Sequence, residues 1–148
     1  MRKSWKVITR GLAACLLLAM WASAADVTLY ESDGTAFAYI ADDQTIYLWS
    51  GDPVGRLESA YGNEFHVFGV SGQHLGWYAA GVFHDDKGLQ VGASAGALSL
   101  LMGGEPAKLT KKPWIRQGYK DVAPVKPVFS NKASSLRFRD LLKPGDSC

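Results

Sequence analysis

The chain has only two cysteines, Cys15 and Cys148, and five of its six prolines lie at or after Pro106. Cys15 falls in an N-terminal segment that has the layout of a signal peptide, so cleavage of that segment leaves Cys148 alone. A single thiol excludes an intramolecular disulfide, and Cys148 is then either unpaired or part of an intermolecular disulfide. The sequence also lacks a later apolar run of about 20 residues, the length that a membrane-spanning helix requires.

The first 24 residues predict a secretory signal peptide. Four basic residues precede an apolar or small segment at residues 11–21, and Ala22-Ser23-Ala24 fits the pattern before a cleavage site. A lipoprotein-like alternative, with processing at Cys15, fits less well because the apolar segment continues after that cysteine. We therefore expect a bacterial protein that is exported to the periplasm or the extracellular space, with a mature chain that begins at Ala25.

Charge divides the mature chain near residue 97. Residues 25–97 contain ten Asp or Glu and two Lys or Arg, whereas residues 98–148 contain ten Lys or Arg and four Asp or Glu. We expect an acidic domain at 25–97 followed by a basic, proline-containing and mostly irregular tail at 98–148. An acidic domain in an exported chain disfavours nucleic-acid binding.

The acidic domain contains a short repeat, in which three residues separate a glycine from a second small residue. The four pairs are Gly34 and Ala38, Gly51 and Gly55, Gly72 and Gly76, and Gly88 and Gly92. The first glycines are 17, 21 and 16 residues apart, about the length of one β-hairpin. Each follows a polar residue between apolar runs, which predicts a tight turn. Because Ala38 is accepted at the second position, we expect that position to be small where backbones approach closely near a common centre.

The runs between these glycines are rich in aromatic and β-branched residues, as half-buried strands are. The repeats are too short for propeller blades of about 40–45 residues. Four hairpins around a pseudo-fourfold axis form the simplest closed arrangement, and closure limits exposed strand edges. The predicted fold class is therefore all-β, with four β-hairpin repeats in a small closed structure.

Three segments resemble the 4-fold beta flower domain of bacterial proteins. They are residues 47–54, 67–77 and 84–88, and the run Gly72-Gln73-His74-Leu75-Gly76-Trp77 is the most specific part. The resemblance covers roughly residues 27–96 and implies four hairpin petals around a pseudo-fourfold axis. It implies no reaction, ligand, cofactor or catalytic residue. Residues 134–142 are similar, more weakly, to the Ser-rich amphipathic end of such proteins.

Two patterns are candidates for catalysis. Residues 92–96 match the nucleophile elbow of α/β-hydrolases at Ser94, but no histidine follows His84, as that fold requires. We interpret this match as chance. His66, His74 and His84 show no metal-ligand spacing, and the acids after His84 precede a turn glycine, where they favour turn formation. We predict no catalytic residue, no metal and no cofactor.

Aromatic residues on the predicted strands have two interpretations. Trp49, Trp77, Tyr47 and Tyr78 fit core packing, and the alternative is an aromatic surface on which glycans stack.

The basic tail is the predicted binding element. Its candidate contact residues are Trp114, Arg116, Phe129, Arg137, Phe138 and Arg139. Either the tail folds back on the acidic domain, or it holds an anionic envelope surface or a protein partner. Exposed ion pairs contribute only about 0.2–1 kcal/mol each, so charge alone would not fix the tail. Folding back therefore requires burial of aromatic residues such as Phe129 and Phe138.

These features predict a non-catalytic exported structural or interaction module of the bacterial envelope. The first alternative is a small secreted hydrolase that uses Ser94 or a histidine and carboxylate site. The second is an effector-associated module that binds another protein. The sequence indicates neither the ligand nor the oligomeric state.

Overall fold

The computed structural model describes residues 24–97 and 102–143. Residues 1–23 of the predicted signal peptide, and both cysteines, lie outside the described residues. Eight antiparallel strands pair in chain order and close into a barrel because the first strand also pairs with the last. The strands are β1 (Val27–Glu31), β2 (Ala36–Ile40), β3 (Thr45–Leu48), β4 (Pro53–Ser59), β5 (Glu64–Gly69), β6 (His74–Ala79), β7 (Val82–His84) and β8 (Gln90–Ser94). This architecture confirms the predicted all-β fold of four hairpins.

Each predicted repeat forms one hairpin, or petal, and its first glycine lies in the turn. The four petals are β1–β2, β3–β4, β5–β6 and β7–β8. Gly34, Gly51, Gly72 and Gly88 have φ values of 83°, 84°, 88° and 80°. These values lie in the left-handed region that glycine adopts without steric cost. Because strand direction alternates around the barrel, all four petal tips lie at the same end.

The second small residue of each repeat follows a β-bulge. In the second petal, for example, Ile46 faces Gly55 and Tyr47 faces Pro53, so Val54 is the extra residue and points into the core. The same register shift occurs in the other three petals. A bulge adds local twist, which helps four short hairpins to close into a narrow barrel.

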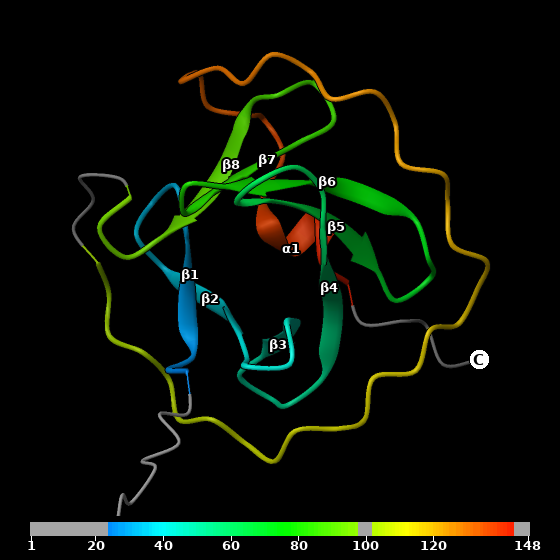
Figure 1. Cartoon of the computed structure of the whole chain (residues 1–148). Helices are drawn as coiled ribbons and strands as arrows, with labels where there is room; N and C mark the ends of the chain where they lie inside the picture. Colours follow the sequence, from blue (N-terminus) through cyan, green and yellow to red (C-terminus); the bar gives the residue numbers. More distant parts are fainter. Residues whose placement is uncertain (1–23, 98–101, 144–148) are drawn as a thin grey trace, which may run out of the picture.

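The centre of the barrel is filled from the C-terminal end of the chain. The short helix α1 (Phe138–Leu141) lies inside the ring of strands (Figure 1). Together with Leu142 it forms the plug, in which Phe138 and Leu142 are fully buried. The Phe138 ring stacks on Phe37 with a centroid distance of 6.0 Å and meets the edge of Phe83 at 5.1 Å. The plug thus completes a core that the strands alone leave open.

Residues 102–137, which we call the strap, encircle the barrel in an extended conformation (Figure 1). Its backbone N–H groups donate hydrogen bonds to the turn-glycine carbonyls of all four petals. The pairs are Gly103 with Gly34, Lys112 with Gly51, Asp121 with Gly72, and Ser130 with Gly88, with N···O distances of 2.8–2.9 Å. The four donors are nine residues apart. The tail therefore folds back on the acidic domain with a period that matches the fourfold barrel.

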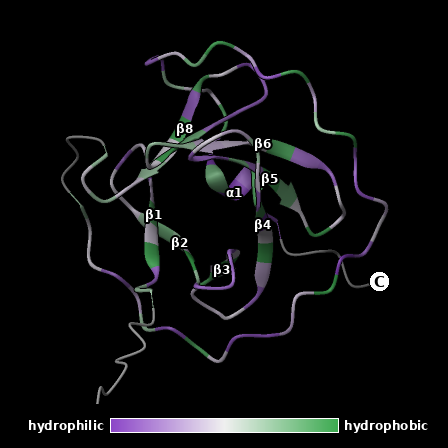
Figure 2. Ribbon diagram, viewed as in Figure 1, coloured by the Kyte–Doolittle hydropathy of each residue, from purple (hydrophilic) through white to green (hydrophobic). Residues whose placement is uncertain are grey.

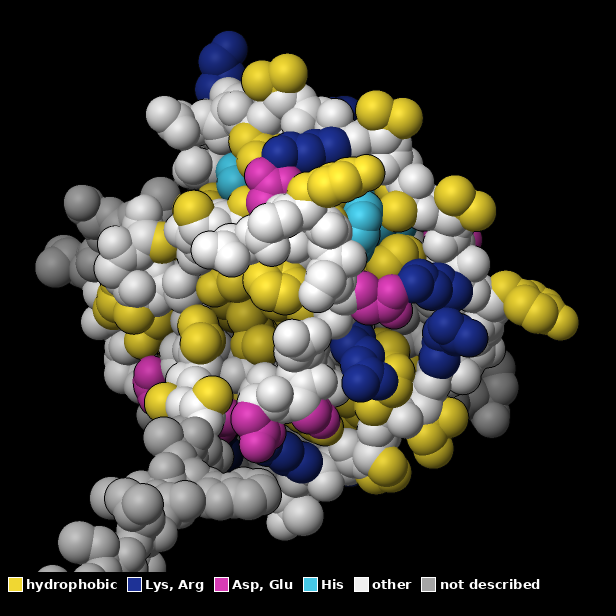
Figure 3. Space-filling view, in the orientation of Figure 1, with side chains coloured by type: hydrophobic (Ala, Val, Ile, Leu, Met, Phe, Trp, Pro, Cys, Tyr) yellow, Lys and Arg dark blue, Asp and Glu magenta, His cyan; other side chains and the backbone are white. Residues whose placement is uncertain are grey.

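Ion pairs also join the strap to the barrel. Lys108 contacts Asp26 at 2.8 Å and Lys126 contacts Glu64 at 2.5 Å, and the other pairs are Lys112 with Asp52 and Lys120 with Glu58. Figure 3 shows basic side chains beside acidic ones over this face. The charge division of the sequence is thus explained by pairing between the two halves of the chain.

The strap also covers aromatic side chains on the outer face of the barrel. Tyr39 and Tyr47 face outward yet are buried, and Lys108 lies 4.6 Å above the Tyr39 ring. Phe129 of the strap packs against Trp77 and His84. Hydrophobic residues concentrate on the strands, whereas hydrophilic and hydrophobic residues alternate along the strap (Figure 2). Among the described residues, no helix is both long and apolar enough to span a membrane.

Candidate functional site

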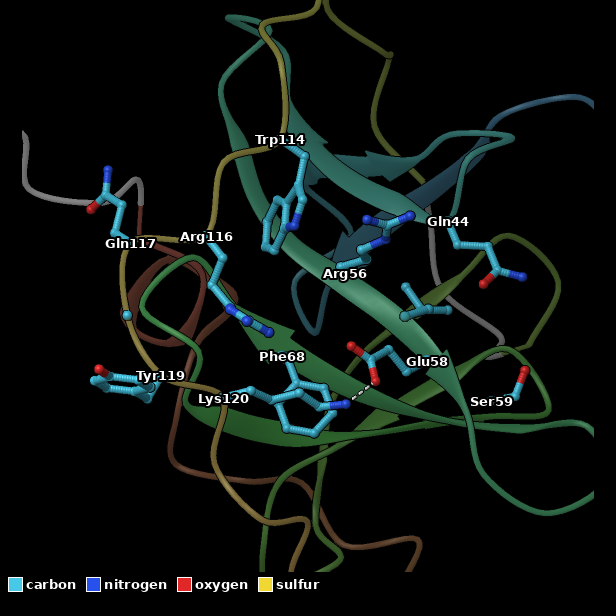
Figure 4. Close-up of a pocket in the computed structure, with 12 residues that line it drawn as sticks. Gln44, Arg56, Glu58, Ser59, Phe68, Trp114, Arg116, Gln117, Tyr119 and Lys120 are labelled. Carbon is cyan, nitrogen blue, oxygen red and sulfur yellow. Dashed lines mark hydrogen bonds and ion pairs between the residues drawn. The ribbon is translucent and has the colours of Figure 1, made fainter.

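A pocket with a volume of 920 Å³ lies between β4 and the strap (Figure 4). Barrel residues form one wall and strap residues 114–120 form the other. Arg56 and Glu58 are two positions apart on β4, so their side chains share its outer face. Phe68 on β5 is the cross-strand partner of Arg56 and extends the same wall. Gln44, which precedes β3, also lines the pocket.

Two petal tips hold the strap wall in place. The strap is bonded to the second petal through Lys112 and to the third through Asp121, and Gln117 N–H donates to the Val70 carbonyl at 2.8 Å. Between these anchors the chain bridges β4 and β5. Trp114 and Arg116 extend from this bridge toward β4 (Figure 4). The pocket therefore exists only because the strap spans two petals.

The charges in this pocket are not balanced. Lys120 pairs with Glu58, and its Nζ lies 4.6 Å from the centre of the Phe68 ring. Arg56 and Arg116 also line the pocket, and neither has a hydrogen-bond or ion-pair partner among residues 24–97 and 102–143. Three cations thus accompany one carboxylate, next to the half-buried indole of Trp114. This arrangement can bind an anion, because guanidinium groups form paired hydrogen bonds with carboxylates and phosphates.

A smaller pocket of 270 Å³ lies at the tip of the fourth petal, between the turn after β7 and the end of the strap. Asp85 is buried there and accepts hydrogen bonds from Lys87 N–H, Leu89 N–H and the Ser134 hydroxyl, at 2.9, 2.9 and 2.6 Å. These bonds satisfy the carboxylate and hold both the turn and the strap. We assign this pocket a structural role.

The three histidines gather on the outer face of the barrel, beneath the strap. His66 Nδ1 lies 3.2 Å from His74 Nε2, and His74 Nδ1 lies 3.0 Å from Asp86 Oδ1. Burial, followed by the adjacent His74, lowers the pKa of His66. Burial also lowers the pKa of His84, whose ring stacks on Phe129 at 4.2 Å. Cross-strand register brings these residues together, and sequence spacing gave no sign of it.

The described residues do not join these histidines to a nucleophile or a metal site. The Ser94 hydroxyl donates to the Gly81 carbonyl at 3.1 Å. Within the described ranges, no three His, Cys, Asp or Glu side chains are arranged to hold a metal ion. The 920 Å³ pocket is lined by no histidine.

The six predicted tail contacts occupy different environments. Trp114 and Arg116 line the large pocket, Phe129 packs on His84, and Arg137 is exposed. Phe138 lies in the barrel core. The Arg139 guanidinium forms a two-point contact with the buried carboxylate of Glu31, at 3.2 and 2.7 Å. Only part of the predicted set therefore faces solvent.

The aromatic residues predicted on the strands mostly pack within the protein. Tyr47 and Trp77 are buried on the outer face, and Tyr78 packs against the core. Trp49 is half-buried, and its indole N–H donates to the Ala36 carbonyl at 3.1 Å. The half-buried indole of Trp114, on the strap, lines the 920 Å³ pocket instead.

A family model described as "4-fold beta flower protein" matches residues 27–142. The match includes the eight strands, the strap and the plug. Neither the curated proteins nor the solved structures gave a match to this chain.

Proposed function

We propose, given that this chain belongs to the 4-fold beta flower proteins, that it is a non-catalytic exported module that binds an anionic component of the bacterial envelope. The family description names an architecture and leaves the activity open. Export is supported by the signal-peptide layout of residues 1–24. In this proposal the strap and the barrel form the binding surface together.

One observation carries this proposal, the unbalanced positive charge of the pocket between β4 and the strap. The strap cations Lys108, Lys112, Lys120 and Lys126 are neutralised by carboxylates of the barrel. Arg56 and Arg116 are different, because both line the pocket and neither has a partner among the described residues. Two guanidinium groups in one pocket repel each other, and an anionic ligand relieves that repulsion.

The hydrolase alternative has less support. His74 is hydrogen-bonded to Asp86, as in a general-base pair. Neither residue lines the large pocket, and Ser94 is bonded to Gly81 instead. A protein-binding role remains a second form of the same proposal, with an acidic protein as the ligand.

The test is co-sedimentation of the mature chain, residues 25–148, with isolated envelope fractions. We expect binding at low salt that weakens near 1 M salt, where the screening length falls to about 3 Å. The Arg56→Gln/Arg116→Gln double variant should lose this binding, and Lys132→Gln is the matched control because Lys132 is exposed outside the pocket. Absence of wild-type binding at low salt would refute the proposal.

A further inference from the structure

We infer that the pocket between β4 and the strap binds an acidic oligosaccharide, with Arg56 and Arg116 holding its carboxylates and Trp114 packing against a sugar ring. This inference rests on the proposed function and names the class of ligand. It depends on three properties of the pocket, namely its size, its hydrogen-bonding groups and its aromatic wall.

The pocket has room for a ligand much larger than a simple ion. Ligand pockets in proteins commonly measure about 300–1,000 Å³, and this one measures 920 Å³. That volume accommodates more than one sugar ring.

The polar groups in the pocket are mostly donors, and they are of two kinds. Arg56 and Arg116 supply charged forks that match the planar carboxylate of a sugar acid. Gln44 and Ser59 supply a neutral amide and a hydroxyl group, which can donate to and accept from sugar hydroxyls. An inorganic anion would use the first kind and leave the second unused.

The aromatic wall supplies the third property. Trp114 extends from the strap into the pocket beside Arg116 (Figure 4). An indole offers a flat apolar surface together with one N–H donor. The C–H face of a pyranose ring is complementary to such a surface, while its hydroxyls point to the rim. Anion recognition and ring recognition are thus adjacent in one pocket.

The protein's own carboxylate leaves two cations of the pocket available to a ligand. Glu58 neutralises Lys120 and is the only acid among the described residues that line the pocket. An incoming carboxylate therefore meets two cations that have no described partner, and it displaces no existing ion pair. This feature separates the pocket from the rest of the strap, where the lysines are paired.

Trigalacturonate is the probe, and the fluorescence of Trp114 is the readout. The mature chain contains three tryptophans, of which Trp77 is buried and Trp49 donates a hydrogen bond to Ala36 of the first petal. We expect trigalacturonate to change the tryptophan emission. The fully methyl-esterified trisaccharide has no charge, and we expect it to bind at least tenfold more weakly. A hydrogen bond to a charged group is worth about 1.5–3 kcal/mol, so Arg116→Gln should raise Kd about tenfold or more.

Variants identify the site and control for folding. Arg56→Gln and Arg116→Gln remove exposed side chains without described partners, so their thermal unfolding should match wild type. Lys132→Gln is the matched control and should leave Kd unchanged, because Lys132 is exposed outside the pocket. Trp114→Leu, measured by calorimetry because it removes the fluorophore, should weaken trigalacturonate binding and leave the unfolding transition in place.

Several outcomes would overturn the inference. Equal binding of the esterified sugar would show that charge is not recognised. Equal binding of inorganic phosphate would show an anion site without sugar recognition. Unchanged affinity in the double arginine variant would place the sugar elsewhere. If trigalacturonate fails to bind while the same double variant loses envelope co-sedimentation, this inference fails and the proposed function stands.

Discussion

Replacement of Phe138 by alanine should remove much of the stability of this protein. Phe138 is fully buried between Phe37 and Phe83, at centroid distances of 6.0 and 5.1 Å. Phe→Ala substitutions in protein cores cost about 3–5 kcal/mol, because the transfer free energy is lost and a cavity remains. We expect a loss of about 4 kcal/mol, from a typical total of about 5–15 kcal/mol. In a domain of this size that loss lowers Tm by roughly 20 °C.

Urea unfolding of the mature chain, followed by tryptophan fluorescence, measures this loss. Leu136→Ala is the matched control, since Leu136 is two residues earlier in the chain and exposes 42% of its surface. Substitutions at such surface positions usually change stability by less than about 0.5 kcal/mol. A Phe138→Ala variant no less stable than Leu136→Ala would refute the reasoning, because the plug would then contribute nothing to the core.

Three further predictions concern other positions. Gly92→Ala should destabilise the fold strongly, because a Cβ atom there would overlap the aromatic ring of the plug. Gly104→Ala is the control, since a Cβ atom at Gly104 has no neighbour within 4 Å, and it should match wild type in thermal unfolding. Burial lowers the pKa of His84, so the unfolded chain binds more protons than the folded chain near and below pH 6.5. The free energy of unfolding should therefore fall as pH drops from 7.5 to 5. His84→Phe should reduce this fall, as measured by urea titrations at the two pH values. Arg139→Gln leaves the buried carboxylate of Glu31 without its two-point partner, and chemical unfolding at pH 7 should show lower stability than for Arg139→Lys.

The petals could be predicted from sequence because their signal is local. A polar residue followed by glycine between apolar runs specifies a tight turn, and the structure has left-handed glycines at Gly34, Gly51, Gly72 and Gly88. The second small position was expected to allow backbones to approach closely. At Gly76 the neighbour is indeed backbone, the carbonyl of His84, and at Gly92 the Tyr30 carbonyl is joined by the side chain of Phe138. No local pattern could have identified that distant neighbour.

The path of the strap could not be predicted for a different physical reason. Its four contacts with the petal tips use backbone N–H groups, which every residue except proline supplies. Gly103, Lys112, Asp121 and Ser130 therefore share a spacing of nine residues but no side-chain type. The large pocket depends on that path, so Trp114 and Arg116 were found as candidates while Arg56, on the opposite wall, was missed.

The plug makes the order of synthesis important for folding. Its contacts reach far back along the chain, since Arg139 and Glu31 are 108 residues apart. Closing so long a loop is slow compared with forming a hairpin. The petals can therefore form as the nascent chain emerges, but the interior is completed only once residues 138–142 have been made. A polypeptide that stops before Phe138 has every strand and still lacks the centre of its core.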